Sequence, residues 1–308
     1  MRPPLIIDIK GNSLDDGPGI RSVIFFKGCP LSCVWCHNPE SRLPLPELSF
    51  DPQKCIGCGS CIEKCQVGAL SRDNVFFVDR IKCTYCFACA KDCPTGALSR
   101  IGQKMTQEEI IEKVLKDKPF FDSSGGGVTF SGGEPTLHMD FLSGLLKTLK
   151  EAGIHTLIET CGYFDFDEFK ENVLPYTDMI YMDIKLFDPK LHKRYCGVEN
   201  GIILENFIKL HELSLKGGFE IVPRTPLVPG ITDTEENLVA IARFLKSNQV
   251  KEIQLLPNNP TWHEKCFSLG ISNRFLEDSP LRKWLPPADV EACKCIFECL
   301  NDSYKTRS

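Results

Sequence analysis

Three cysteines near the start of the chain follow the spacing C-x3-C-x2-C: Cys29, Cys33 and Cys36. A [4Fe-4S] cube usually takes one cysteine thiolate on each of its four irons. A set of three cysteines would leave one iron open to bind and react with a small molecule, whereas a cluster with four cysteines only passes electrons. A three-cysteine zinc site is the alternative that this spacing leaves open.

Two further cysteine runs follow, and both have the spacing C-x2-C-x2-C-x3-C. Bacterial two-cluster ferredoxins have this spacing, and the fourth cysteine of each run ligates the other cluster. We therefore expect two more [4Fe-4S] clusters, with a pair of zinc knuckles as the alternative. The first cluster would be held by Cys55, Cys58, Cys61 and Cys93. The second would be held by Cys65, Cys83, Cys86 and Cys89.

The composition fits metal centres in a reducing compartment. The chain has 308 residues, 17 of them cysteine, and its N-terminus lacks the apolar core and cleavage site of a signal peptide. No apolar run is long enough to span a membrane. We therefore expect a cytoplasmic protein, where dense cysteines indicate metal rather than disulfides. A net charge of −5 and a pI near 5.8 give no basic surface for nucleic acid.

Most of the remaining chain predicts strands that alternate with amphipathic helices. Short apolar runs predict strands at 5–9, 22–26, 128–130, 155–159, 179–184, 219–222 and 252–256. Thr106 to Glu109 has the pattern of a capping box. Asp140 is expected to cap a further helix, and residues 232–235, TDTE, are expected to start another. Repeated βα units with apolar strands indicate a parallel sheet with right-handed crossovers. About six such units favour a partial, open (β/α)6 TIM-like barrel over a closed one.

A proline-rich segment at 43–46 separates the first strands from the paired cysteine runs. We expect residues 1–44 and 103–308 to form the barrel, with the three-cysteine loop in its first part. Residues 45–102 would be an inserted small α+β domain of the bacterial ferredoxin type. A module of this size buries little apolar surface, so its clusters would substitute for a large core.

Polar residues follow several of the predicted strands, where α/β barrels place their sites. One strand leads into Ser131, Gly132, Gly133 and Glu134, and the glycines allow a close approach to a ligand. Asp183 and Lys185 lie two residues apart on an apolar strand, so they point to the same face. Charges inside a barrel are costly unless they are paired or used. An internal ion pair is therefore the alternative to a ligand site, also for Glu159, Thr160 and Arg224.

The segment from Asp16 to Glu40, DGPGIRSVIFFKGCPLSCVWCHNPE, resembles the N-terminal signature of glycyl-radical enzyme activating enzymes, a branch of the radical S-adenosylmethionine (SAM) superfamily. The resemblance is to the type with a two-cluster ferredoxin insert, similar to pyruvate formate-lyase activating enzyme. It covers nearly the whole chain and is weakest after Asn258. It implies reductive cleavage of SAM at the three-cysteine cluster, giving a 5′-deoxyadenosyl radical that takes a hydrogen from a glycine of a partner enzyme.

The resemblance also implies which residues bind SAM. It assigns SAM contacts to Trp35, Ser131, Gly132, Gly133, Glu134, Glu159, Thr160, Asp183 and Lys185. Glu159, Thr160 and Asp183 fall where the family holds a monovalent cation, although the family has aspartate where this chain has Glu159. Residues 255–259, LLPNN, resemble the family's L-L-P-Y-H motif, whose histidine contacts SAM. Asn259 takes that position and His263 lies four residues later, and either could serve.

The implied partners are a glycyl-radical enzyme and a flavodoxin or ferredoxin as electron donor, with the chain itself a monomer. Asp16 and Arg224 are candidates for gripping the partner's glycine loop, and the insert would relay electrons or dock the donor. The alternatives are a radical SAM enzyme that acts on a small molecule or another peptide, and a multi-cluster ferredoxin-type electron carrier. Six cysteines have no ligand role and are expected to be buried thiols: Cys161, Cys196, Cys266, Cys293, Cys295 and Cys299.

Overall fold

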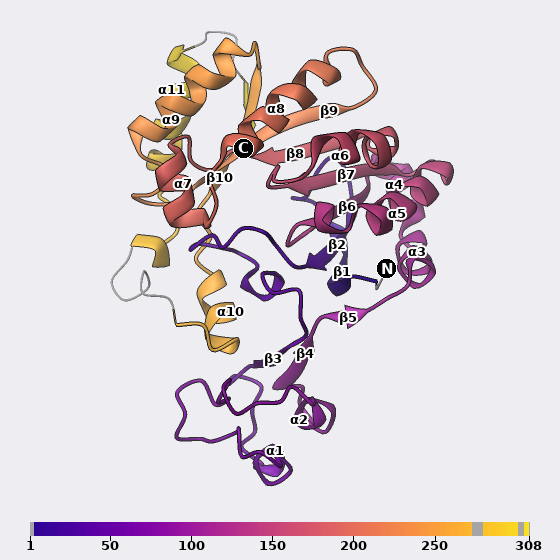
Figure 1. The fold of residues 1–308 in the computed structure, drawn as a ribbon, viewed down its shortest axis with the longest axis vertical. Helices are drawn as coiled ribbons and strands as arrows, with labels where there is room; N and C mark the ends of the chain where they lie inside the picture. The colour runs from indigo at the N-terminus through magenta and orange to yellow at the C-terminus, as the bar shows by residue number, and fades with distance from the viewer. Residues whose placement is uncertain (1–2, 273–279, 301–304, 308) are drawn as a thin grey trace.

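A nine-stranded sheet forms the frame of the protein. The computed structural model describes residues 3–272, 280–300 and 305–307. The strand order is β11-β10-β9-β8-β7-β6-β2-β1-β5. Six successive strands run parallel: β2 (Arg21–Lys27), β6 (Gly127–Gly132), β7 (His155–Thr160), β8 (Met179–Asp183), β9 (Glu220–Leu227) and β10 (Glu252–Pro257). The expected α/β fold with six parallel strands of an open barrel is confirmed (Figure 1).

The edges of the sheet extend beyond these six strands. β1 (Leu5–Ser13) pairs antiparallel with β2, and β5 (Gln103–Lys104) pairs antiparallel with β1. A turn-rich loop joins β1 to β2 with no crossover helix, and such a connection produces antiparallel neighbours. At the opposite edge, β11 (Lys305–Arg307) runs parallel to β10.

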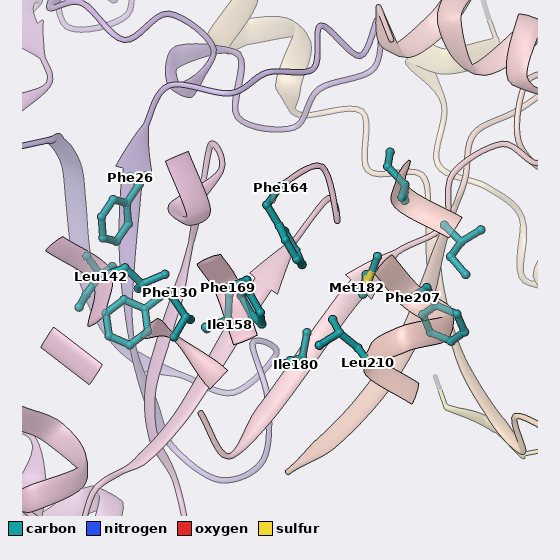
Figure 2. Packing of buried hydrophobic residues seen from close by; sticks show 14 of the residues in the cluster. Phe26, Phe130, Leu142, Ile158, Phe164, Phe169, Ile180, Met182, Phe207 and Leu210 are labelled. Carbon is teal, nitrogen blue, oxygen red and sulfur yellow. The ribbon is translucent and has the colours of Figure 1, made fainter. Parts of the chain in front are cut away.

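Helices pack against the sheet and bury the main hydrophobic core. Phe130 on β6 lies beside Leu142 of α5, Ile158 on β7 lies beside Phe169 of α6, and Ile180 on β8 lies beside Leu210 of α8 (Figure 2). The described α-helices of the barrel are α3 (Gln107–Leu115), α4 (Lys118–Ser124), α5 (Met139–Glu151), α6 (Phe166–Asn172), α7 (Pro189–Cys196), α8 (Gly201–Ser214), α9 (Glu235–Ser247), α10 (Trp262–Ser268) and α11 (Pro287–Leu300). In the described part of the chain, no helix has the length and apolarity to cross a membrane.

The helix starts show where local sequence signals hold and where they fail. The capping box at Thr106 is confirmed, because its hydroxyl and the Glu109 carboxylate each accept from the other residue's backbone N–H. The expected start at Asp140 is wrong, since a 3-10 turn (Pro135–His138) runs directly into α5. The helix start expected within residues 232–235 is confirmed, because Thr234 caps α9, while the Thr232 hydroxyl bonds within the preceding turn.

The segment with the paired cysteine runs forms a separate small sheet outside the barrel (Figure 1). β3 (Glu47–Phe50) and β4 (Leu98–Ile101) pair antiparallel, with the short helices α1 (Ser60–Glu63) and α2 (Ala88–Lys91) between them in sequence. Its own core consists of Leu48, Phe50, Leu70, Phe77, Val78, Ala97 and Leu98.

A buried ion pair ties this small sheet to the barrel. Lys27, at the end of β2, lies 2.5 Å from the carboxylate of Glu47 at the start of β3, and the two side chains are 0% and 12% exposed. The Lys27 ammonium also donates to the carbonyl of Glu40. On the other side of the junction, Arg80 donates to the carbonyl of Ser268 at 3.1 Å. The small sheet is therefore held to the barrel at two points.

Lys27→Met should destabilise the protein because it leaves the Glu47 carboxylate without its cation in a nearly dry site. Removing one partner of a buried pair costs about 3–5 kcal/mol. Adding Glu47→Gln should restore most of this loss, since no charge then remains buried. Anaerobic denaturant unfolding measures both effects.

The exposed pair Lys193 and Glu199, at 3.0 Å, provides the control. Lys193→Met should leave the unfolding midpoint almost unchanged, because water solvates the carboxylate that remains. Equal losses for Lys27→Met and Lys193→Met would show that burial does not decide the outcome.

Candidate functional site

The three-cysteine loop begins directly after β2 and is held from two sides. On one side, the Gly28 and Cys29 N–H groups donate to the carbonyls of Ser41 and Arg42 at 2.6 and 3.1 Å. On the other side, the Ser32 and Val34 N–H groups donate to the carbonyls of the last two residues of α7, at 2.7 and 3.0 Å. Backbone bonds therefore fix the path of the loop without using any cysteine side chain.

The thiols of this loop lie in an apolar environment. Burial raises the pKa of Cys36 to about 12. Contact with the Cys196 thiol, together with burial, raises the pKa of Cys33, whereas contact with Cys161 lowers the pKa of Cys29. Metal ligands must be thiolates, so loading iron here displaces protons from buried thiols. The surrounding apolar side chains that limit water access are Leu31, Trp35, Leu186, Val228, Trp262 and Leu281.

The small sheet brings cysteines of both paired runs together. One cavity is lined by Cys55, Cys58 and Cys61 of the first run and by Cys89 and Cys93 of the second. The lining contains all four cysteines expected for one cluster, including the exchanged Cys93, together with Cys89 of the other expected set. Within the described residues, no three histidine, cysteine or acidic side chains converge closely enough for a single metal ion. A four-iron cube instead takes each cysteine on a different iron, so its ligands surround a cavity.

The other expected set is also grouped. Burial raises the pKa of Cys89 to about 11, and the nearby Cys83 and Cys86 thiols act in the same direction. Cys65, Cys83 and Cys89 pack against the small apolar core of this sheet. The Cys65 sulfur accepts from the N–H of Ala69 at 3.3 Å.

Glu134 joins the ends of two strands and is completely buried. One carboxylate oxygen accepts from Thr136 N–H at 3.2 Å, from Thr136 Oγ1 at 2.8 Å and from Thr160 Oγ1 at 2.9 Å. The other accepts from Cys161 N–H at 2.7 Å. The carboxylate is thus occupied by donors of the chain itself, and the loop after β6 is locked to the end of β7.

Backbone conformation and close packing explain why glycine occupies the two positions before Glu134. Gly132 has φ +102, in the region that favours glycine, and a Cβ on Gly133 would lie 2.1 Å from the carbonyl oxygen of Gly28. Gly133 N–H donates to the carbonyl of Phe26 at 2.9 Å. The two glycines therefore let this loop approach the backbone from which the three-cysteine loop begins.

Four charged side chains form a buried network at the ends of β7, β8 and β9. Arg224 bridges two carboxylates, with Nη1 2.5 Å from Glu159 and Nε 3.0 Å from Asp183. Lys185 lies 2.6 Å from the other oxygen of Asp183. The internal ion pair between Asp183 and Lys185 is thus present. Burial alone would raise the pKa of Asp183, but Lys185 and Arg224 outweigh burial and hold that pKa below its usual value.

The other residues singled out from the sequence lie at different positions. Asp16 accepts from the Ser13 hydroxyl, and burial raises the pKa of Asp16. Asn259 accepts from Thr261 N–H at 3.0 Å before α10. One ring nitrogen of His263 lies 3.1 Å from the carbonyl of Leu281. Asn259 and His263 thus bond Thr261 and Leu281, which are not part of the charged network.

Several residues that matter to the site were missed or misjudged from the sequence. Cys161 and Cys196 contact two cysteines of the loop, which a reading of spacing alone cannot show. Arg21 is fully buried and bonds Thr129 at 2.6 Å, and its place in the GPG-x-R motif was a signal. The expectation of buried thiols holds for Cys161, Cys196, Cys266 and Cys293 and is wrong for Cys295 and Cys299, which are exposed on α11.

Comparisons with known proteins agree with this geometry. The family model for the radical SAM superfamily matches residues 80–261, a span that starts after the three-cysteine loop, and a 4Fe-4S binding domain model matches residues 48–71. A radical SAM methyltransferase from Sphaerobacter thermophilus shares the fold, with a TM-score of 0.54 at 12% identity, covering 100% of this chain and 77% of that one.

Two curated relatives match most of the chain. The trans-4-hydroxy-L-proline dehydratase activating enzyme of Clostridioides difficile is 41% identical over 258 residues, covering 82% of this chain and 84% of that protein. The (2S)-3-sulfopropanediol dehydratase activating enzyme of Klebsiella oxytoca is 38% identical over 278 residues, covering 87% and 86%. The chain therefore belongs to the radical SAM superfamily, within its glycyl-radical enzyme activating enzymes.

Proposed function

We propose that Cys29, Cys33 and Cys36 hold a [4Fe-4S] cluster whose open iron binds SAM, and that this centre activates a partner enzyme. When bound, the cluster and SAM supply a 5′-deoxyadenosyl radical, which takes a hydrogen from a glycine of the partner. One observation carries the proposal: the three-cysteine loop lies beside the buried charged network. The Cys196 thiol and burial raise the pKa of Cys33, and the charge of the nearby Lys185 opposes this rise.

The residues of the chain have distinct tasks in this proposal. The three cysteines bind, and Trp35 with its apolar neighbours excludes water from the cluster. Contacts to SAM are proposed for the backbone of Ser131, Gly132 and Gly133 and for the charged groups of Asp183 and Lys185. Because the carboxylate of Glu134 is fully bonded, we assign Glu134 and Thr160 to positioning this loop. No side chain needs to act as an acid or a base.

Residues 45–102 are proposed to form the inserted domain, with two further [4Fe-4S] clusters and three in the whole chain. One cavity whose lining includes Cys55, Cys58, Cys61 and Cys93 supports the first of them. With all four ligand positions filled, these clusters can only pass electrons, so we assign them to a relay from a flavodoxin or ferredoxin. The activating enzyme is proposed to act as a monomer in the cytoplasm.

The partner is proposed to be a glycyl-radical enzyme that presents its glycine loop as an extended peptide. The relatives support the kind of partner, since one is named for a hydroxyproline dehydratase and the other for a sulfopropanediol dehydratase. Asp16 remains a candidate for holding this peptide. Arg224 could do so only by loosening its bonds to Glu159 and Asp183.

Cysteine variants separate the radical centre from the relay. After anaerobic reconstitution, the wild type should bind about twelve irons per chain and release 5′-deoxyadenosine when reduced with dithionite. Cys36→Ala should abolish this release. The double variant Cys58→Ala, Cys86→Ala should retain it, because dithionite can reduce the SAM-binding cluster directly. A wild type that is fully loaded with iron and cleaves no SAM would instead favour an electron carrier.

Transfer of a labelled hydrogen tests the partner step. The enzyme, SAM and a reductant should produce a carbon-centred radical, detected by electron paramagnetic resonance (EPR), in a hydroxyproline or sulfopropanediol dehydratase of this class. If that partner carries glycine deuterated at Cα, deuterium should appear in 5′-deoxyadenosine. Cys36→Ala is the matched control. Deuterium-free 5′-deoxyadenosine formed with every dehydratase would point to a small-molecule substrate.

Glu134→Gln should weaken the junction between the loop after β6 and the end of β7. In either orientation of the amide, its NH2 group faces a backbone N–H, of Thr136 or of Cys161. An unsatisfied buried donor costs about 1–3 kcal/mol. We expect a lower unfolding midpoint and weaker SAM binding, whereas the exposed Glu171→Gln should change neither. Unchanged stability in Glu134→Gln would show that these bonds do not hold the loop.

A further inference from the structure

The charged network at the ends of β7 to β9 is complete in itself. Its two carboxylates, Glu159 and Asp183, face two cations, Lys185 and Arg224, so the formal charges cancel. All four side chains are at least four-fifths buried, with exposed fractions of 13%, 19%, 10% and 9%. Buried carboxylates require such compensation, because an unpaired charge in this environment is strongly unfavourable.

Each oxygen of the two carboxylates has a donor from the chain itself. Glu159 Oε1 accepts from Arg224 Nη1, and Glu159 Oε2 accepts from the Ser131 hydroxyl at 2.6 Å. Asp183 Oδ1 accepts from Arg224 Nε at 3.0 Å, and Asp183 Oδ2 accepts from Lys185 Nζ at 2.6 Å. A metal cation placed at these oxygens would lie beside the ammonium of Lys185 and the guanidinium of Arg224, which already balance both carboxylates.

Thr160 does not complete a cation site either. Its hydroxyl donates to Glu134 at 2.9 Å and accepts from Gly162 N–H at 3.0 Å. The hydroxyl is therefore engaged with Glu134 and not with Glu159. The three residues that the family resemblance assigns to a monovalent cation do not fit one in this chain.

The position of Arg224 explains how one side chain serves both carboxylates. Arg224 on β9 pairs in register with Asp183 on β8, and Glu159 on β7 pairs with Tyr181 on β8. The guanidinium crosses β8 with its centre 5.0 Å from the centroid of the Tyr181 ring. A planar group with several donors can bridge two carboxylates in this way, and the ring face adds a favourable contact.

We propose that the Arg224 guanidinium replaces a monovalent metal cation in this chain, so that SAM binding requires neither K⁺ nor Na⁺. This inference rests on the proposed SAM site. Arg224 is a positioning residue here: it neutralises Glu159 and Asp183 and thereby leaves Lys185 oriented toward the three-cysteine loop. Glu159 suits this arrangement because a glutamate on β7 reaches both Ser131 and Arg224.

Exchange of the salt tests the inference in the intact, iron-loaded enzyme. SAM affinity is measured anaerobically from the change in the EPR spectrum of the reduced cluster. The measurement is made in a potassium salt, a sodium salt and a tetramethylammonium salt of equal ionic strength, so that screening is constant. The wild type should show SAM affinities that agree within about twofold in the three salts. A clear loss in tetramethylammonium would overturn the inference.

Arg224→Met should create the dependence that the wild type lacks. The variant leaves two carboxylates with one cation, so its SAM affinity should be at least about tenfold higher in K⁺ or Na⁺ than in tetramethylammonium. Adding Glu159→Gln restores the charge balance and should remove the dependence. Arg243→Met, on the exposed face of α9, is the matched control and should behave as wild type. Equal affinities of Arg224→Met in all salts would overturn the assigned role.

Two further results keep the outcomes distinct. Glu159→Asp is a milder variant in case Arg224→Met does not fold: its shorter side chain should loosen the Arg224 contact, and it should gain a dependence on K⁺ of the same sign. If an iron-loaded wild type binds no SAM in any salt, the proposed function itself fails. Binding that is lost only in tetramethylammonium refutes the replacement of the cation alone.

Discussion

A buried carboxylate needs hydrogen-bond donors or cations around it, and this requirement determines how the carboxyl ends of the strands are arranged. Glu134 is satisfied by hydroxyl and backbone donors, whereas Glu159 and Asp183 are satisfied by Arg224 and Lys185. These bonds link β6 to β7 and β7 to β9. The strand ends are therefore fixed by polar interactions, while the apolar core fixes the strands themselves (Figure 2). A site built in this way is rigid before any ligand binds.

The three-cysteine loop depends on that arrangement. Its glycine-rich neighbour, at 132–133, packs on the backbone of Gly28, and the last turn of α7 holds its other side. The cysteines are thereby positioned by hydrogen bonds between backbone groups, and their thiols stay available for iron. In the proposed cluster, iron binding would have to overcome the raised pKa values of the buried Cys33 and Cys36 thiols, and a tightly held loop would lower the entropy cost of binding.

The sequence predicted those features that depend on spacing along the chain. Cysteine spacing predicted that Cys93 lies with the first run, because ligands of one cluster lie close in sequence or repeat in a known order, and Cys93 does line a cavity with Cys55, Cys58 and Cys61, although Cys89 lines it too. Apolar periodicity located the parallel strands. The bonds of Arg224 could not be predicted, since they depend on which residues of neighbouring strands are in register. Asp140 does not cap α5 for a related reason: the preceding 3-10 turn, Pro135–His138, runs directly into the helix, which begins at Met139.

A buried charge that is compensated by its neighbours also joins the barrel to the small sheet. Lys27 is the last residue of β2 and lies two residues before Cys29, and its ammonium bonds both Glu47 of the insert and the backbone of Glu40. One buried cation therefore touches the strand that starts the three-cysteine loop, the segment that follows this loop and the first strand of the insert. The proposed electron relay would require a constant separation between its centres. A buried, bonded lysine fixes the position of the small sheet relative to the three-cysteine loop better than a proline-rich linker alone.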